Sequence, residues 1–182
     1  MLPAVIIKFM NKKNKKLLII FAASAVVLAA IFLTQRITQR GGGGDENPSK
    51  YSASVLTAFE NFFDFKTISM KDGKVSHKFE VKNDGEELVR IEKVYTSCMC
   101  TAASVADSKG KNWGTFGMPG HAGPSKTNIT VEPGESFVVE AIFDPAAHGP
   151  SGVGLAERSV YLESNSQKSP KIELKFTAIV TN

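Results

Sequence analysis

The chain has 182 residues, enough for one ordinary domain with an extension. Basic residues outnumber acidic ones, 22 to 18, but residues 1–50 hold eight of the basic residues and only two of the acidic ones. Residues 51–182 are therefore slightly acidic, which excludes the strongly basic surface of a nucleic-acid-binding domain.

The first predicted element is a membrane anchor. Residues 17–35 begin with LLIIFAASAVVLAAIFL and form a run of 19 uncharged positions. As a helix this run is about 28 Å long, close to the roughly 30 Å hydrocarbon core of a bilayer. Five lysines precede the run, so residues 1–16 are predicted to be a basic cytoplasmic tail and the rest of the chain to lie outside the cytoplasm.

A cleaved signal peptide is the alternative to this anchor. Such a peptide has an apolar region of about 7–15 residues that ends at a small-residue cleavage site. Here the bulky residues Ile31, Phe32 and Leu33 end the run instead. We therefore expect an uncleaved single-pass anchor, with the membrane as a partner through residues 17–35.

Residues 36–50 are predicted to be a linker, because GGGGDENPSK at 41–50 cannot bury a core and is typical of a flexible tether. Residues 51–63 follow, with Val55, Phe59 and Phe62 at near-helical spacing. This segment is either a short amphipathic helix or an irregular strap that packs against the following domain.

From residue 63 onward the pattern becomes that of β-strands. In residues 136–144, for example, every second side chain is apolar, which indicates a strand with one buried face. Seven such segments are separated by turn signals, at 63–68, 75–83, 88–96, 127–131, 136–144, 158–165 and 171–180. Residues 51–182 are therefore predicted to form an immunoglobulin-like antiparallel β-sandwich.

One segment interrupts this rhythm. Residues 102–126 are rich in Gly, Ser, Lys and Pro and are predicted to form a long loop, which in a compact domain is usually functional or partly disordered. The segment contains Trp113, which either folds onto the sandwich or contacts a protein partner together with Phe116.

The two cysteines of the chain, Cys98 and Cys100, lie immediately before this loop in the stretch TSCMCT. On an extended strand, residues i and i+2 point to the same side, so both sulfur atoms are expected at one place. Two thiolates suit Cu(I) or Zn(II), and Met118 and His121 are the further ligands best placed by sequence. Two other histidines, at 77 and 148, depend on the fold.

Two other interpretations of the cysteines remain open. In an oxidising compartment the pair could form a disulfide, but so small a ring requires the strand to buckle and leaves the bond strained and easily reduced. Alternatively, the sulfur atoms only pack at the end of the sandwich.

Several stretches together resemble a known family: FDF at 63–65, VSHKFEVKNDGEELVRIEKVYTSCMCT, VEPGESFVVEAIFDP and RSVYLESN. They are similar to the bacterial domain of unknown function 1573, over roughly residues 63–180. The resemblance implies an immunoglobulin-like fold related to the hydin and sperm-protein sandwiches, in an exported setting. Met99 stands where that family has glycine, and the resemblance implies no catalytic residue.

No stretch of the chain carries a phosphate-binding loop or a nucleophile elbow, so we expect no enzyme. Two functional hypotheses follow. The first is a membrane-anchored binding or scaffolding module that acts through strand edges and residues 102–126, and that survives loss of both cysteines. The second is a thiol-based metal carrier or redox protein, which does not survive that loss.

Overall fold

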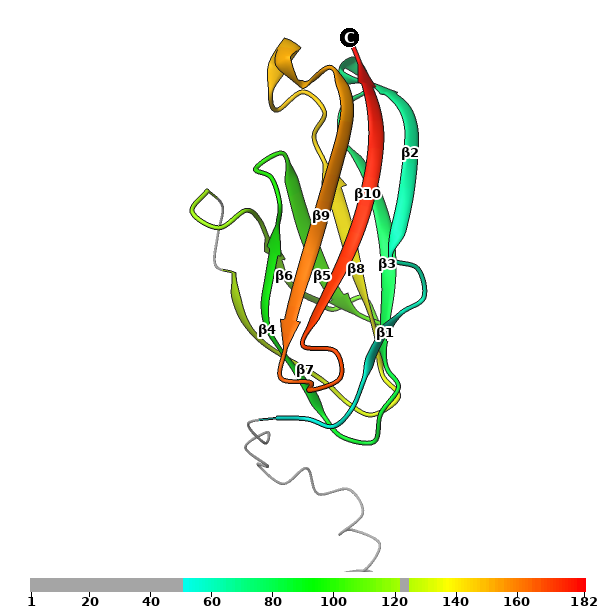
Figure 1. Ribbon diagram of the computed structural model, residues 1–182, viewed down its shortest axis with the longest axis vertical. Helices are drawn as coiled ribbons and strands as arrows, with labels where there is room; N and C mark the ends of the chain where they lie inside the picture. The colour runs from blue at the N-terminus through cyan, green and yellow to red at the C-terminus, as the bar shows by residue number, and fades with distance from the viewer. Residues whose placement is uncertain (1–50, 122–124) are drawn as a thin grey trace, which may run out of the picture. The chain divides into compact units, whose positions relative to one another are not determined.

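The computed structural model describes residues 51–121 and 125–182 (Figure 1). The predicted tail, anchor and linker, residues 1–50, lie outside the described residues. Within the described residues, no helix has the length and apolar character needed to cross a bilayer.

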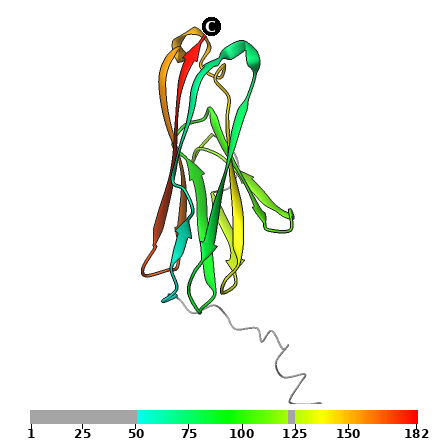
Figure 2. The same ribbon diagram turned by 90° about the vertical axis from the view of Figure 1, so that its right-hand side faces the viewer.

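Two five-stranded sheets pack face to face as two layers (Figure 2). The first sheet has the order β1 (Leu56–Ala58), β3 (Val75–Asn83), β8 (Ser136–Phe143), β5 (Thr101–Asp107), β6 (Asn112–Phe116). The second has the order β2 (Phe62–Ser69), β10 (Lys171–Thr181), β9 (Gly154–Ser164), β4 (Val89–Thr96), β7 (Lys126–Val131). Two single 3-10 turns, Met70–Asp72 and Gly149–Gly152, complete the described elements. The predicted all-β sandwich and its seven strands are confirmed.

The core lies between the sheets and follows the predicted alternation. In β8 every second residue is buried, and these are Phe137, Val139, Ala141 and Phe143. In β10 the side chain of Phe176 is fully buried, and its ring meets that of Phe143 at a centroid distance of 5.5 Å. Burial of such a side chain contributes about 1.5–3 kcal/mol, so these inward faces hold the two layers together.

The prediction of a purely antiparallel sandwich is wrong at one edge. Strands β2 and β10 run parallel, whereas the other paired strands run antiparallel. The two are more than a hundred positions apart in the sequence, so no hairpin constrains their direction. Their ladder contains a register shift between Thr177 and Ile179, and Lys66 in β2 takes a positive φ of 62°.

The prediction of one long loop at residues 102–126 is also wrong. Most of this segment forms the hairpin β5–β6, whose turn is closed by Asp107. The Asp107 carboxylate accepts hydrogen bonds from the amides of Lys109 and Lys111 at 2.9 and 2.8 Å, and Gly110 supplies the positive φ of 84°. The small residues of β5 conceal its alternation in the sequence, although it has a buried face.

The N-terminal segment is the irregular strap rather than an amphipathic helix. It forms the short strand β1, which pairs with β3 and buries Leu56. Polar contacts also fix it: the Ser54 hydroxyl donates to the Glu87 carbonyl at 2.7 Å, and the Ser166 hydroxyl donates to the Ser54 carbonyl at 2.6 Å. The strap is therefore part of the domain.

Candidate functional site

Two connections that cross between the sheets meet toward the upper end of the view in Figure 1. Residues 97–100 join β4 to β5, and residues 144–153 join β8 to β9. Since β5 and β8 are paired neighbours, their ends bring the two connections together. The Asp144 amide donates to the Cys100 carbonyl at 2.9 Å.

The cysteines lie in a tight turn rather than on a strand. The Thr101 amide donates to the Cys98 carbonyl at 3.1 Å, which places Met99 and Cys100 at the centre of a β-turn. The Cys100 amide donates to Cys98 Sγ at 3.4 Å, and Met99 is 54% exposed. The prediction that both sulfur atoms meet at one place is confirmed, but the turn brings them together.

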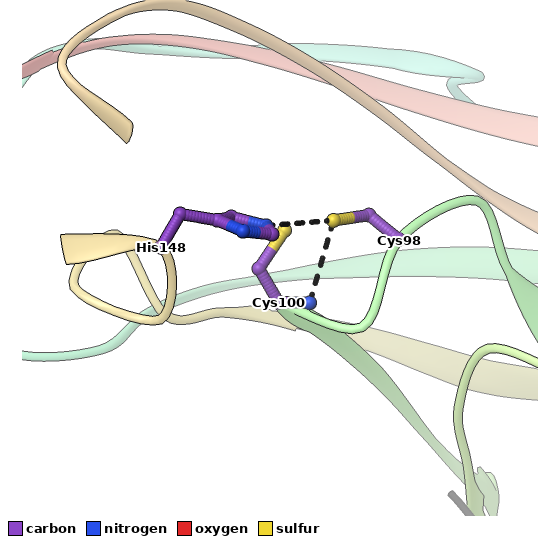
Figure 3. Close-up of side chains that lie close together, drawn as sticks. All are labelled: Cys98, Cys100 and His148. Atoms are coloured by element: carbon purple, nitrogen blue, oxygen red, sulfur yellow. Dashed lines mark hydrogen bonds between the residues drawn. The ribbon is translucent and has the colours of Figure 1, made fainter. Parts of the chain in front are cut away.

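His148 completes a group of three ligand-bearing side chains (Figure 3). Its Nε2 atom lies 3.2 Å from Cys98 Sγ, and the two sulfur atoms and one imidazole nitrogen all lie within 4.8 Å of one another. Cys100 is 3% exposed, Cys98 is half-buried and His148 is exposed. Both cysteines are free thiols. Because Cys100 is buried and His148 is exposed, the group has one buried side and one side open to solvent.

Arg158 approaches the same group from β9. Its Nε–H donates to Cys100 Sγ at 3.0 Å, and one terminal nitrogen donates to the Glu157 carbonyl at 2.8 Å. The guanidinium carbon lies 5.8 Å from the ring centroid of Phe143. A half-buried positive charge is thus held directly against the buried sulfur.

These contacts separate the pKa values of the two thiols. Burial raises the pKa of Cys98, but hydrogen bonds from the thiol and the amide of Cys100, and one from His148, oppose it. Together with the charge of Arg158 they lower the pKa of Cys98 to about 7. Burial, and the hydrogen bond to Cys98, raise the pKa of Cys100, although Arg158 and Thr101 act in the opposite direction. Cys98 is therefore the thiol that ionises first.

Alkylation of the reduced full-length protein should show this difference. We expect the rate for Cys98 to rise with pH and to reach half its maximum near pH 7, because only the thiolate reacts. Cys100 should react more slowly throughout, since it is buried and its pKa is raised. Iodoacetamide labelling followed by peptide mass spectrometry measures both rates. Equal rates, or a Cys98 midpoint at the ordinary value of about 8.5, would contradict the assigned contacts.

The other residues singled out in the sequence lie elsewhere. Met118 and His121 share a turn, in which the His121 amide donates to the Met118 carbonyl at 3.1 Å. Among the described residues, no hydrogen bond links either side chain to a cysteine, and His121 is outside the three-residue group. Phe116 is buried and offers a partner almost no surface, whereas Trp113 is half-buried against Phe137.

Sequence reasoning had no means of choosing His148 over the other histidines, and it missed Arg158. His77 is engaged elsewhere, with its Nε2 atom 2.6 Å from Glu60 Oε1 and its ring stacked on Phe63. No signal in the sequence could have found either His148 or Arg158. The topology that places the β4–β5 and β8–β9 connections at the same end of the sandwich cannot be read from local patterns.

Two thiol sulfur atoms and an imidazole nitrogen on one patch are the ligands of soft or borderline metal ions such as Cu(I) and Zn(II). The nearby guanidinium favours the thiolate forms that such ions require. The three side chains therefore have the chemistry that could hold such an ion.

The described residues form an immunoglobulin-like two-sheet sandwich. The model of the family described as "Protein of unknown function (DUF1573)" matches residues 56–112, which confirms the predicted resemblance over that segment. The match runs from β1 to the first residue of β6 and includes both cysteines. No curated protein matches the sequence.

Solved structures are similar to this chain at low sequence identity. A protein of unknown function from Porphyromonas gingivalis W83 is 13% identical, with a TM-score of 0.51 over 75% of this chain and 51% of that one. This chain therefore spans about half the length of that protein. The secreted serine protease VesC from Vibrio cholerae is 13% identical, with a TM-score of 0.44 over 69% and 23% of the two chains. The ASH/PapD-like domain of human CEP192 is 14% identical, with a TM-score of 0.41 over 76% and 92%.

Proposed function

We propose that this chain is a membrane-anchored binding module, held outside the cytoplasm, and that it binds a soft metal ion. The side chains that coordinate this ion are those of Cys98, Cys100 and His148. The observation that carries the proposal is the convergence of their three ligand atoms within 4.8 Å, on two separate connections of the sandwich. We propose binding because the described site offers three ligand atoms on one patch and a charge beside them.

The placement of the side chains supports binding of an ion that can enter and leave. Cys100 anchors the buried side of the group, while His148 lies on its exposed side. The backbone bond between Asp144 and Cys100 fixes the spacing of the two connections. A preformed group of this kind loses little conformational entropy on binding.

Elemental analysis with thiol counting tests the metal proposal. Full-length protein purified in detergent, with and without reductant, is incubated with Zn(II) or Cu(I) and then desalted. We expect one metal ion per chain when two thiols are titratable and none when the thiols are oxidised. Retention of metal by protein without titratable thiols would place the ligands elsewhere.

The anchor proposal rests on the 19 uncharged residues at 17–35 and the lysines before them. Protease added to intact spheroplasts is expected to cut within the Gly-rich residues 36–50 first and to release a folded fragment that contains the sandwich. The fragment is detected by mass spectrometry of the supernatant. Protection of the domain until the membrane is lysed would reverse the topology.

A scaffolding role is the second candidate, and an exposed apolar pair favours it. Leu155 and Ile179 lie directly opposite each other on β9 and β10 and are 71% and 51% exposed. A protein partner that buries this pair would be lost from the double variant Leu155→Asp/Ile179→Asp but retained by a variant without cysteines. Metal binding has the opposite dependence, so the two roles are separable.

A further inference from the structure

We propose that the bound ion is Cu(I) rather than Zn(II), and that Arg158 makes this choice by balancing the charge of the centre. The inference rests on the proposed metal-binding function and concerns the same three ligands. It adds a positioning residue, Arg158, which touches no metal but lies 3.0 Å from Cys100 Sγ.

The ligand spacing suits a single ion. Metal–sulfur and metal–nitrogen bonds in such sites are about 2.3 and about 2.0–2.1 Å, so two ligand atoms on one ion are separated by less than about 4.6 Å. The ligand atoms of Cys98, Cys100 and His148 all lie within 4.8 Å of one another. Small side-chain rotations are therefore enough to place all three on one ion.

The charge of the site distinguishes a monovalent from a divalent ion. Two thiolates and Cu(I) carry one net negative charge, and the guanidinium of Arg158 neutralises it. With Zn(II) the thiolates and the ion already sum to zero, which leaves the half-buried guanidinium unbalanced. An uncompensated charge at a partly buried position is costly, so the site as a whole favours Cu(I).

The number of ligands points the same way. Structural zinc sites are closed by four protein ligands, whereas the group here contains three, and no fourth His, Cys, Asp or Glu joins it in the described part of the chain. Zn(II) would need a water molecule to complete its shell, while Cu(I) is satisfied by two or three soft ligands. The exposed imidazole of His148 then closes a low-coordinate copper centre.

The test is a pair of competition titrations on reduced full-length protein in detergent, kept anaerobic. Cu(I) is titrated against bicinchoninate and Zn(II) against a chromogenic zinc chelator. We expect one Cu(I) per chain, retained in the presence of equimolar Zn(II). Arg158→Gln should lower the preference for Cu(I) over Zn(II) by about 10–100-fold, the usual effect of a residue next to a metal ligand, whereas Arg158→Lys retains most of it.

Two histidine variants keep the test interpretable. His148→Ala should weaken Cu(I) binding at least about tenfold, and His121→Ala, which removes another exposed histidine, should leave it unchanged. Both positions are exposed, so neither variant threatens the fold, and circular dichroism checks Arg158→Gln. Displacement of Cu(I) by Zn(II), or an unchanged metal preference in folded Arg158→Gln, overturns the copper inference and leaves the metal module standing. Binding of neither ion overturns both.

Discussion

Replacing Cys98 and Cys100 together by serine is expected to lower the affinity for a soft metal ion by more than about a hundred-fold. Loss of one supporting residue next to a ligand costs about 10–100-fold, and this double variant removes both thiolates. A serine hydroxyl does not ionise near neutral pH and is a poor ligand for soft ions. A chelator competition titration on the full-length protein measures the loss.

The matched control removes the two residues that the sequence nominated as further ligands. Met118→Leu with His121→Ala should bind metal as tightly as the wild type, because the ligand group is completed by His148. If this control lost binding while the double serine variant kept it, the ligands would lie in the turn after β6 and the site assigned here would be wrong.

Replacing Phe176 by alanine is expected to destabilise the domain by about 3–5 kcal/mol, the usual cost of truncating a fully buried phenylalanine. Phe176 has no exposed surface, and its ring meets Phe65 and Phe143 at centroid distances of 5.4 and 5.5 Å. The cavity also removes support from Phe143, over whose ring Arg158 lies. Urea unfolding followed by tryptophan fluorescence measures the change.

Ile179→Ala is the control for this variant. Ile179 lies on the same strand, but its side chain is 51% exposed, so its truncation should change the stability by no more than about 0.5 kcal/mol. Equal losses for the two variants would mean that the outer face of β10 is as tightly packed as the core, contrary to the sandwich described here.

The parts of the fold that the sequence could predict are those with strong alternation. The segment that became β8 has large apolar residues at every second position, and its burial follows that pattern. In β5 the buried positions include the small Ala103, so a strand was mistaken for a loop. The parallel pairing of β2 with β10 could not be predicted, because alternation is the same for both strand directions.

The candidate site, like the fold, could be predicted from the sequence only in part. The spacing of Cys98 and Cys100 was enough to predict that their sulfur atoms meet, although the local structure is a turn. His148 lies fifty positions after Cys98. It reaches the cysteines only because the β4–β5 and β8–β9 connections both pass from one sheet to the other at the same end of the sandwich. Arg158 begins the stretch RSVYLESN, but nothing in that stretch indicates that its side chain meets Cys100, so this contact is a product of tertiary structure.

X-ray absorption at the copper edge of the Cu(I)-loaded full-length protein tests the assigned centre most directly. It reports the number and kind of atoms bound to the ion. The account predicts two sulfur neighbours and one nitrogen neighbour, with the nitrogen lost in His148→Ala and kept in His121→Ala. A centre with nitrogen and oxygen neighbours alone, or one whose nitrogen disappears only in His121→Ala, would contradict it.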